Sequence, residues 1–326
     1  MIRRVAVIVV AGILAGRDVA AQSDSVARAS VLVRAGRLIA VRTGTVLTNQ
    51  AILIEGDRIK EVGPADAVAA HALRDVRVID LRNGTVLPGL IDCHTHITSD
   101  PGDYYKQLFR MSAIDEAVRA HLFAKRTLDA GFTTVRNVGA GEFIDVALRN
   151  AINEGAIPGP RMLVSTMPLS ATGGHGTYLV ADIYNDDYII AEYTRLGFPQ
   201  KIIEKERLVG RQQRENFKKA VQAGVKIAFG TDAGVYPHGW NAKQFAHMVR
   251  WGTTPLQAIQ AATVNAADLL GWADRVGALE PGKFADVIGV AGDPLQDVTV
   301  LEHVGFVMKG GQVVKDSLTG GAKAAR

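Results

Sequence analysis

The chain has 326 residues, of which 48% are hydrophobic and 21% charged, a balance typical of globular proteins that bury a core. Its formal net charge is +4, and no run of lysine and arginine with interleaved aromatic residues accompanies that charge, so we expect no nucleic-acid partner. A single cysteine, Cys93, excludes a disulfide within the chain.

The first 21 residues have the pattern of a secretory signal peptide. Arg3 and Arg4 precede an apolar run at residues 5–15, which is too short to span a bilayer, and small residues at 19–21 form the expected cleavage site. The alternative is an uncleaved anchor. We expect a periplasmic or secreted protein that begins at Gln22 and has no transmembrane segment once the signal is removed.

Short β-runs separated by glycine and asparagine follow the signal, and the same style returns near the C-terminus. Turn signals lie at residues 56–57 and 83–84, and a glycine pair at 310–311 predicts a hairpin. Two β-rich ends around a different middle predict one small β-domain, built from residues 22–84 and 275–320.

The middle of the chain alternates strand-like and helix-like segments. Strands are expected at residues 85–91, 133–138, 161–165, 178–184 and 225–232, and helices at 112–130, 142–153, 199–223 and 254–270. Alternation of this kind predicts a parallel sheet.

Residues 87–96 have the pattern of an apolar strand that ends in two histidines. Side chains two residues apart on a strand point the same way, so His94 and His96 share a face, whereas Cys93 is expected to pack in the core. Two imidazoles on one side of a strand end can bind one metal ion. A later apolar strand ends at Asp232, whose carboxylate could complete the site, and the combination indicates a metal-dependent hydrolase.

Three motifs resemble those of the amidohydrolase superfamily, and more narrowly its exported prolidase-like and imidazolonepropionase-related branch. They are LPGLIDCHTH at 87–96, GTDAG at 230–234 and GALEPGKFAD at 277–286, and SATGGHG at 170–176 fits the same branch. The resemblance implies a (β/α)₈ barrel that carries one or two divalent metals, with zinc the expected ion, beside a β-sandwich.

The resemblance also implies roles for single residues. His94 and His96 match the first pair of metal ligands, and Asp232 matches the last ligand and the catalytic carrier of protons. His175 would touch the substrate, although a simple turn residue is the alternative. His238 follows Asp232 closely and is expected to bind substrate at the mouth of the site, with a loop-surface position as the alternative.

The middle is too short for a complete barrel. Such a barrel takes about 250 residues, whereas residues 85–271 number only 187. No lysine lies between Arg161 and Lys201, so the family's carboxylated lysine has no counterpart, and the two later histidine ligands are missing as well. We expect an incomplete TIM-type barrel at residues 85–274, which lacks about three βα units near residue 176.

The sequence therefore predicts an exported enzyme that uses a metal and water to hydrolyse C–N bonds in small substrates, such as Xaa-Pro or other dipeptides or N-acyl amino acids. The alternative is a non-catalytic truncated remnant that folds poorly, or only as a homo-oligomer whose neighbours cover the open edges of the barrel.

The protein isolated from the exported fraction of its host should begin at Gln22, because the signal peptide is removed during translocation. Intact mass measurement and N-terminal sequencing check this, and a mature exported sample that retains Met1 would contradict it.

Overall fold

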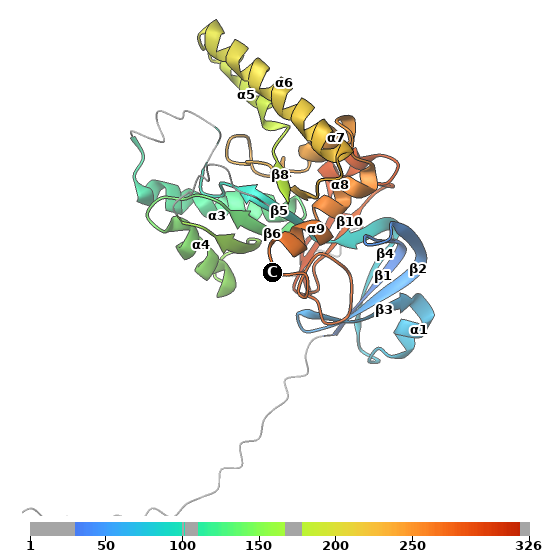
Figure 1. Cartoon of the computed structure of the whole chain (residues 1–326). Helices are drawn as coiled ribbons and strands as arrows, with labels where there is room; N and C mark the ends of the chain where they lie inside the picture. Colours follow the sequence, from blue (N-terminus) through green and yellow to red (C-terminus); the bar gives the residue numbers. More distant parts are fainter. Residues whose placement is uncertain (1–29, 100, 102–109, 167–177, 320–326) are drawn as a thin grey trace, which may run out of the picture.

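The computed structural model describes residues 30–99, 101, 110–166 and 178–319; the predicted signal peptide and His175 lie outside the described residues. Figure 1 shows a β-rich part next to an α/β part, from which a hairpin of two helices projects. Within the described ranges, none of the helices combines the length and apolar character needed to cross a bilayer.

Strands from both chain ends form one sheet in the order β12-β11-β10-β4-β1-β2-β3. Antiparallel pairing of β10 with β4 joins the C-terminal hairpin to the N-terminal strands. The strands are β1 (Ser30–Ala40), β2 (Thr45–Glu55), β3 (Arg58–Pro64), β4 (Arg77–Pro88), β10 (Val287–Val290), β11 (Phe306–Lys309) and β12 (Gln312–Asp316), with helix α1 (Ala65–Ala70) after β3 and the 3₁₀ helix η1 (Val298–His303) after β10.

One of the buried clusters of this sheet joins its two halves. Ile52 and Ile54 from β2 belong to the same buried cluster as Phe306 and Met308 from β11, so the sheet curls around side chains from its two halves. Large twisted sheets commonly curl in this way. The predicted two-layer sandwich is not confirmed, because these strands are hydrogen-bonded into a single sheet.

Only some of the turns predicted from glycine residues occur in this sheet. Gly56 and the pair Gly310 and Gly311 have positive φ and connect β2 to β3 and β11 to β12, as predicted. The turn predicted at residues 83–84 is wrong, since β4 runs through it. The register between β1 and β4 shifts there instead, since Ala35 pairs with Leu81 and Arg37 with Thr85, and residues 82–84 of β4 stand opposite Gly36. The Arg82 carbonyl approaches Gly36 so closely that a Cβ atom there would lie 1.9 Å from it.

The α/β part alternates parallel strands with helices, as predicted. Its strands are β5 (Leu90–Thr95), β6 (Phe132–Asn137), β7 (Arg161–Val164), β8 (Leu179–Ala181) and β9 (Ile227–Phe229). Its helices are α3 (Ala113–Asp129), α4 (Ile144–Asn153), α5 (Asn185–Arg195), α6 (Gln200–Gln222), α7 (Lys243–Arg250), α8 (Pro255–Ala261) and α9 (Val264–Leu269). Helices α5 and α7 were not expected, and the single helix expected at 254–270 is divided at Thr263, which has a non-helical backbone.

These strands form an open arc in the order β8-β9-β5-β6-β7. Hydrogen bonds pair β5 with β6, β6 with β7 and β8 with β9, all in parallel. A parallel bridge between Thr95 and Ala233 joins β5 to the chain that follows β9. Neither β7 nor β8 has a second strand partner among the described residues, so the sheet does not close, in agreement with an incomplete barrel.

Aromatic packing fixes the centre of the arc. The Phe229 ring of β9 lies 5.5 Å from the Phe132 ring of β6 and 4.4 Å from the Phe245 ring of α7, measured between centroids. All three side chains are fully buried. They hold two strands that are far apart in sequence, together with a helix, in one cluster.

Replacement of Phe229 by alanine should therefore lower the free energy of unfolding by about 3–5 kcal/mol, the usual cost of deleting a buried aromatic ring. Val225→Ala is the matched control, because Val225 just precedes β9 and is 43% exposed; it should cost less than about 0.5 kcal/mol. Urea denaturation followed by circular dichroism measures both. Equal destabilisation would contradict the assignment of Phe229 to the core.

Candidate metal centre

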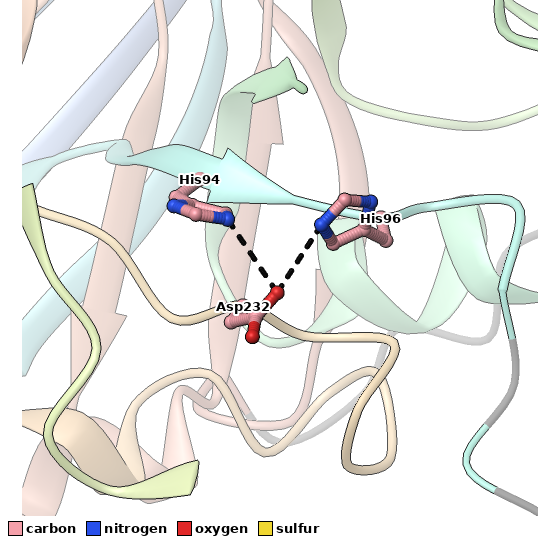
Figure 2. A group of neighbouring side chains, drawn as sticks. All are labelled: His94, His96 and Asp232. Carbon is pink, nitrogen blue, oxygen red and sulfur yellow. Dashed lines mark ion pairs between the residues drawn. The ribbon is translucent and has the colours of Figure 1, made fainter. Parts of the chain in front are cut away.

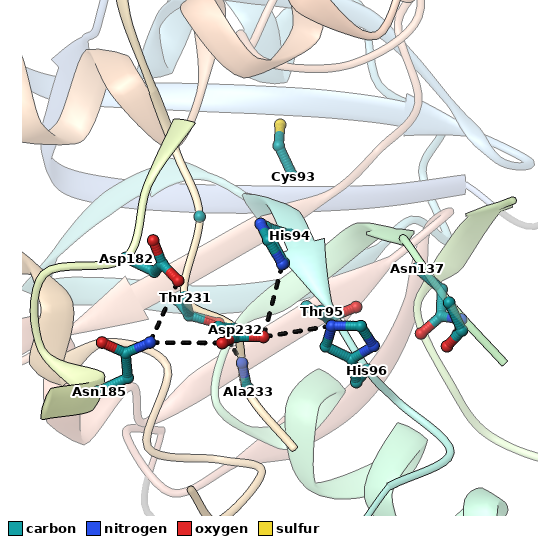
Figure 3. A network of polar contacts seen from close by, with 12 residues as sticks. Cys93, His94, Thr95, His96, Asn137, Asp182, Asn185, Thr231, Asp232 and Ala233 are labelled. Atoms are coloured by element: carbon teal, nitrogen blue, oxygen red, sulfur yellow. Dashed lines mark hydrogen bonds and ion pairs between the residues drawn. The ribbon is translucent and has the colours of Figure 1, made fainter. Parts of the chain in front are cut away.

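Two imidazoles lie at the carboxyl end of β5. His94 and His96 point to the same side, and their ring centroids are 5.6 Å apart. Their side chains remain about one-third exposed, at 32% and 29%. Cys93, between them, points to the opposite side and is fully buried in an apolar cluster (Figure 3), which confirms its predicted packing role. Burial raises the pKa of its thiol to about 12, so the thiol stays protonated.

The carboxylate of Asp232 faces both rings. Its Oδ1 atom lies 3.4 Å from Nε2 of His94 and 3.2 Å from Nε2 of His96 (Figure 2). One ligand atom from each of the three side chains lies within 4.8 Å of the others, so together they can hold one divalent ion. Sequence reasoning selected these three residues, and the structure brings them together.

Backbone geometry places Asp232 at this point. Its φ is +57°, a left-handed conformation that is uncommon outside glycine and often occurs at functional sites. The amide nitrogen of Asp232 donates to the His94 carbonyl at 2.8 Å, and the His96 amide donates to the Ala233 carbonyl at 2.8 Å. The strand that carries the histidines therefore also fixes the loop that carries the carboxylate.

A buried polar cluster supports that loop from below. The Asp92 carboxylate accepts hydrogen bonds from the Thr231 hydroxyl at 2.6 Å and the Asn241 amide at 2.8 Å. Burial raises the pKa of Asp92 to about 6, against the opposing effect of these donors. Sequence reasoning did not identify Asn241, which lies nine residues beyond Asp232 in a loop without a recognisable pattern.

Charges within the site are strongly coupled. Burial alone would raise the pKa of Asp232, but hydrogen bonds from His94 and His96 outweigh it and hold this pKa well below its usual range. Burial alone would lower the pKa of His94, yet the Asp232 carboxylate raises it above its ordinary value. The site thus favours a negative carboxylate beside positive charge, the electrostatic state that a bound cation also requires.

A second carboxylate adjoins this group. Asp182 follows β8, and Asn185 in the first turn of α5 donates through Nδ2 to Asp182 at 3.1 Å and to Oδ2 of Asp232 at 3.3 Å (Figure 3). Burial and the neighbouring Asp232 raise the pKa of Asp182. Neither Asp182 nor Asn185 was predicted, because no residue spacing distinguishes them from other polar residues of the segment after β8.

The sequence also predicted substrate contacts by His175 and His238. His175 lies outside the described residues. His238 is buried, with Nε2 at 2.9 Å from the Ser99 carbonyl and its ring stacked on Phe123, which leaves no exposed ring nitrogen for a substrate. Asn137, at the end of β6, is buried, and its Oδ1 accepts a hydrogen bond from the Ile97 amide at 2.7 Å, so it fixes the strand ends.

A cavity of about 360 Å³ lies at the other end of the strands. Its lining includes Arg161, the first residue of β7, together with Phe284, which precedes β10, and Lys309, the last residue of β11. None of the three clustered side chains lines it. The cavity therefore belongs to the junction between the two parts of the molecule.

Comparison with known proteins identifies the family. The sequence model of the amidohydrolase family matches residues 85–202 and 170–314. This chain belongs to the amidohydrolase family. The two matches overlap at residues 170–202, which include the position where the sequence predicted an internal loss. Members of the family generally use a divalent metal, for which His94, His96 and Asp232 form a suitable set.

Curated relatives of this amidohydrolase are longer than the chain. It is 42% identical over 104 residues to ochratoxinase from Aspergillus niger, covering 30% of this chain and 21% of that protein. It is 22% identical over 377 residues to adenine deaminase from Rubrobacter xylanophilus, covering 92% and 61%. The second alignment exceeds the length of this chain, so the relative carries residues that have no counterpart here.

Solved amidohydrolase structures share the fold. A Xaa-Pro dipeptidase with methionine bound in its active site superposes with a TM-score of 0.78 at 28% identity, covering 87% of this chain and 99% of that one. A prolidase complexed with N-methylphosphonate-L-proline gives a TM-score of 0.75 at 19% identity, covering 88% and 100%. The arc of strands therefore corresponds to part of a TIM-type barrel.

The burial of His238 predicts a particular pH dependence. Burial lowers the pKa of His238 to about 4 from an ordinary 6.5, so between these values the unfolded chain binds the proton more tightly. The stability that neutral His238 contributes is fully present above pH 6.5 and is lost as the pH falls towards 4. Between pH 7 and pH 4, the free energy of unfolding of the metal-free wild type should therefore fall by about 3 kcal/mol relative to that of His238→Gln.

Urea denaturation at each pH measures this difference. The contribution of Asp92 to the pH dependence cancels, because both proteins contain it. His71→Gln is the matched control, since the His71 side chain is 62% exposed; its difference from the wild type should stay nearly constant. A constant difference for His238→Gln would place His238 in contact with solvent and contradict the structure.

Proposed function

We propose that this chain is an exported metal-dependent amidohydrolase that cleaves amide or peptide-type C–N bonds, with zinc as its metal. The observation that carries the proposal is the convergence of His94, His96 and Asp232 from the two strand ends that meet in the arc. Its dipeptide character is supported by the 28% identity to a Xaa-Pro dipeptidase over most of the chain.

The donor set fits a catalytic ion. Nε2 of His94, Nε2 of His96 and Oδ1 of Asp232 would hold it, and three protein ligands with an open position are typical of catalytic zinc sites. Such an ion, when bound, polarises a carbonyl and lowers the pKa of its water to about 7.

Asp232 carries the proton in the proposed reaction. Its Oδ2 atom faces away from the imidazoles and is held by Asn185, so this oxygen is placed to accept a proton from the attacking water and to pass it to the leaving nitrogen. The other oxygen, Oδ1, would share the ion with Nε2 of His94 and Nε2 of His96, which would orient the carboxylate. The buried Asp92 carboxylate accepts a hydrogen bond from Thr231, the residue before Asp232, and so fixes the position of the loop.

The second candidate is a non-catalytic remnant of such an enzyme. Among the described residues no lysine or further histidine joins the three clustered side chains, and β7 and β8 each lack a second strand partner. Unpaired strand edges promote association, so this candidate includes a homo-oligomer in which a neighbour covers them. Light scattering of the purified chain reports that oligomeric state.

Zinc loading tests the proposal. Wild-type protein dialysed against zinc should retain about one ion per chain, because the described residues form one set of ligands. His94→Ala should lower the affinity for zinc at least about 100-fold and abolish turnover of alanyl-proline. His71→Ala, which changes an exposed histidine, is the control and should behave as the wild type.

Metal analysis by mass spectrometry and a ninhydrin assay of released proline provide the two measurements. Wild-type protein without bound zinc, or His94→Ala with unchanged affinity, would refute the metal centre. Bound zinc without turnover would favour the remnant.

A further inference from the structure

We propose that Asp182 determines substrate specificity, by binding the protonated amino group of a substrate with a free N-terminus. The inference rests on the proposed function and narrows its substrate class. It selects aminoacyl compounds such as dipeptides over N-acyl amino acids, which carry no positive charge at that position.

The first support is position. Asp182 lies at the carboxyl end of β8, where the strands of a TIM-type barrel place their catalytic and binding residues. Its carboxylate is joined to that of Asp232 through one amide group, since Asn185 Nδ2 donates to both (Figure 3). The two carboxylates are therefore separated by one amide nitrogen, so a small substrate at Asp232 is within reach of Asp182.

The second support is unbalanced charge. Asp182 is half-buried, and the charged groups that act on it are His94 and the repelling carboxylate of Asp232. Within the described ranges, no lysine or arginine forms an ion pair with it. Half-buried carboxylates are usually paired with a cation, because burial removes water that would otherwise stabilise the charge. A cationic group from outside the chain would supply that partner.

The third support concerns the kind of cation. Asn185 turns its NH₂ group toward both carboxylates, and the reverse orientation would set its oxygen against two negative oxygens. Asn185 therefore offers no oxygen ligand here, and Asp182 is not part of the group that can hold a metal. An ammonium group has three donors and needs only acceptor oxygens, so it suits Asp182 better than a second metal ion does.

The experiment compares two ligands that differ only in this charge. Zinc-loaded wild type, Asp182→Asn and the control Asp187→Asn are titrated by calorimetry with alanyl-proline and with N-acetyl-alanyl-proline, in a buffer at pH 7. If a peptide is cleaved, KM from initial rates replaces the dissociation constant. Asp187 is the matched control, because it is an acidic residue of α5 that pairs with Arg214.

We expect the wild type to bind alanyl-proline at least about tenfold more tightly than its acetylated form, the usual effect of one hydrogen bond to a charged group. Asp182→Asn should remove that preference, leave the affinity for the acetylated peptide unchanged and retain zinc. Asp187→Asn should keep the preference.

Three results would overturn the inference: equal binding of both peptides by the wild type, equal weakening of both peptides in Asp182→Asn, or loss of zinc from Asp182→Asn. The last would make Asp182 a metal ligand. A zinc-loaded wild type that binds neither peptide would contradict both the inference and the proposed function, whereas equal binding with intact zinc contradicts the inference alone. Thermal melting of each variant confirms that it is folded.

Discussion

The meeting of β5 with the loop after β9 is the constraint on which the rest of the structure depends. It joins residues that lie almost 140 positions apart in sequence, through backbone hydrogen bonds between His94 and Asp232 and between His96 and Ala233. In a complete barrel the first and last strands are neighbours, and here they remain neighbours although the middle of the barrel is short. His94, His96 and Asp232, the family's metal ligands that have counterparts in this chain, all lie at this junction.

Sequence reasoning located that junction because its signals are local. Alternation along a strand determines that His94 and His96 share a face, and it determines equally that Cys93 does not. The parallel strands and the hairpin at Gly310 and Gly311 also follow from patterns within a few residues. The resemblance of these patterns to those of a known family then identified Asp232 as the last metal ligand.

The remaining features depend on tertiary contacts that no short pattern records. Asn185 matters because α5 starts beside β9, and Asn241 because it folds back under Thr231. The strand through residues 83–84 overrides a strong turn signal, since the long β4 can pair with both β1 and β10 only if it continues. His238 shows the same limitation: proximity to Asp232 along the chain predicted a ligand contact, but packing on Phe123 turns the ring inward.

The curled sheet built from both chain ends has a consequence for biosynthesis. Strand β4 emerges from the ribosome about 200 residues before its partner β10, and the N-terminal strands lack half of their core until the last hairpin, which ends at Asp316, has been made. Contacts of such long sequence separation form slowly, because a large loop must close before they stabilise the chain. During translation, the apolar side chains of the N-terminal strands therefore lack the C-terminal strands that cover them. We expect the nascent chain to depend on chaperones until its final residues have been made.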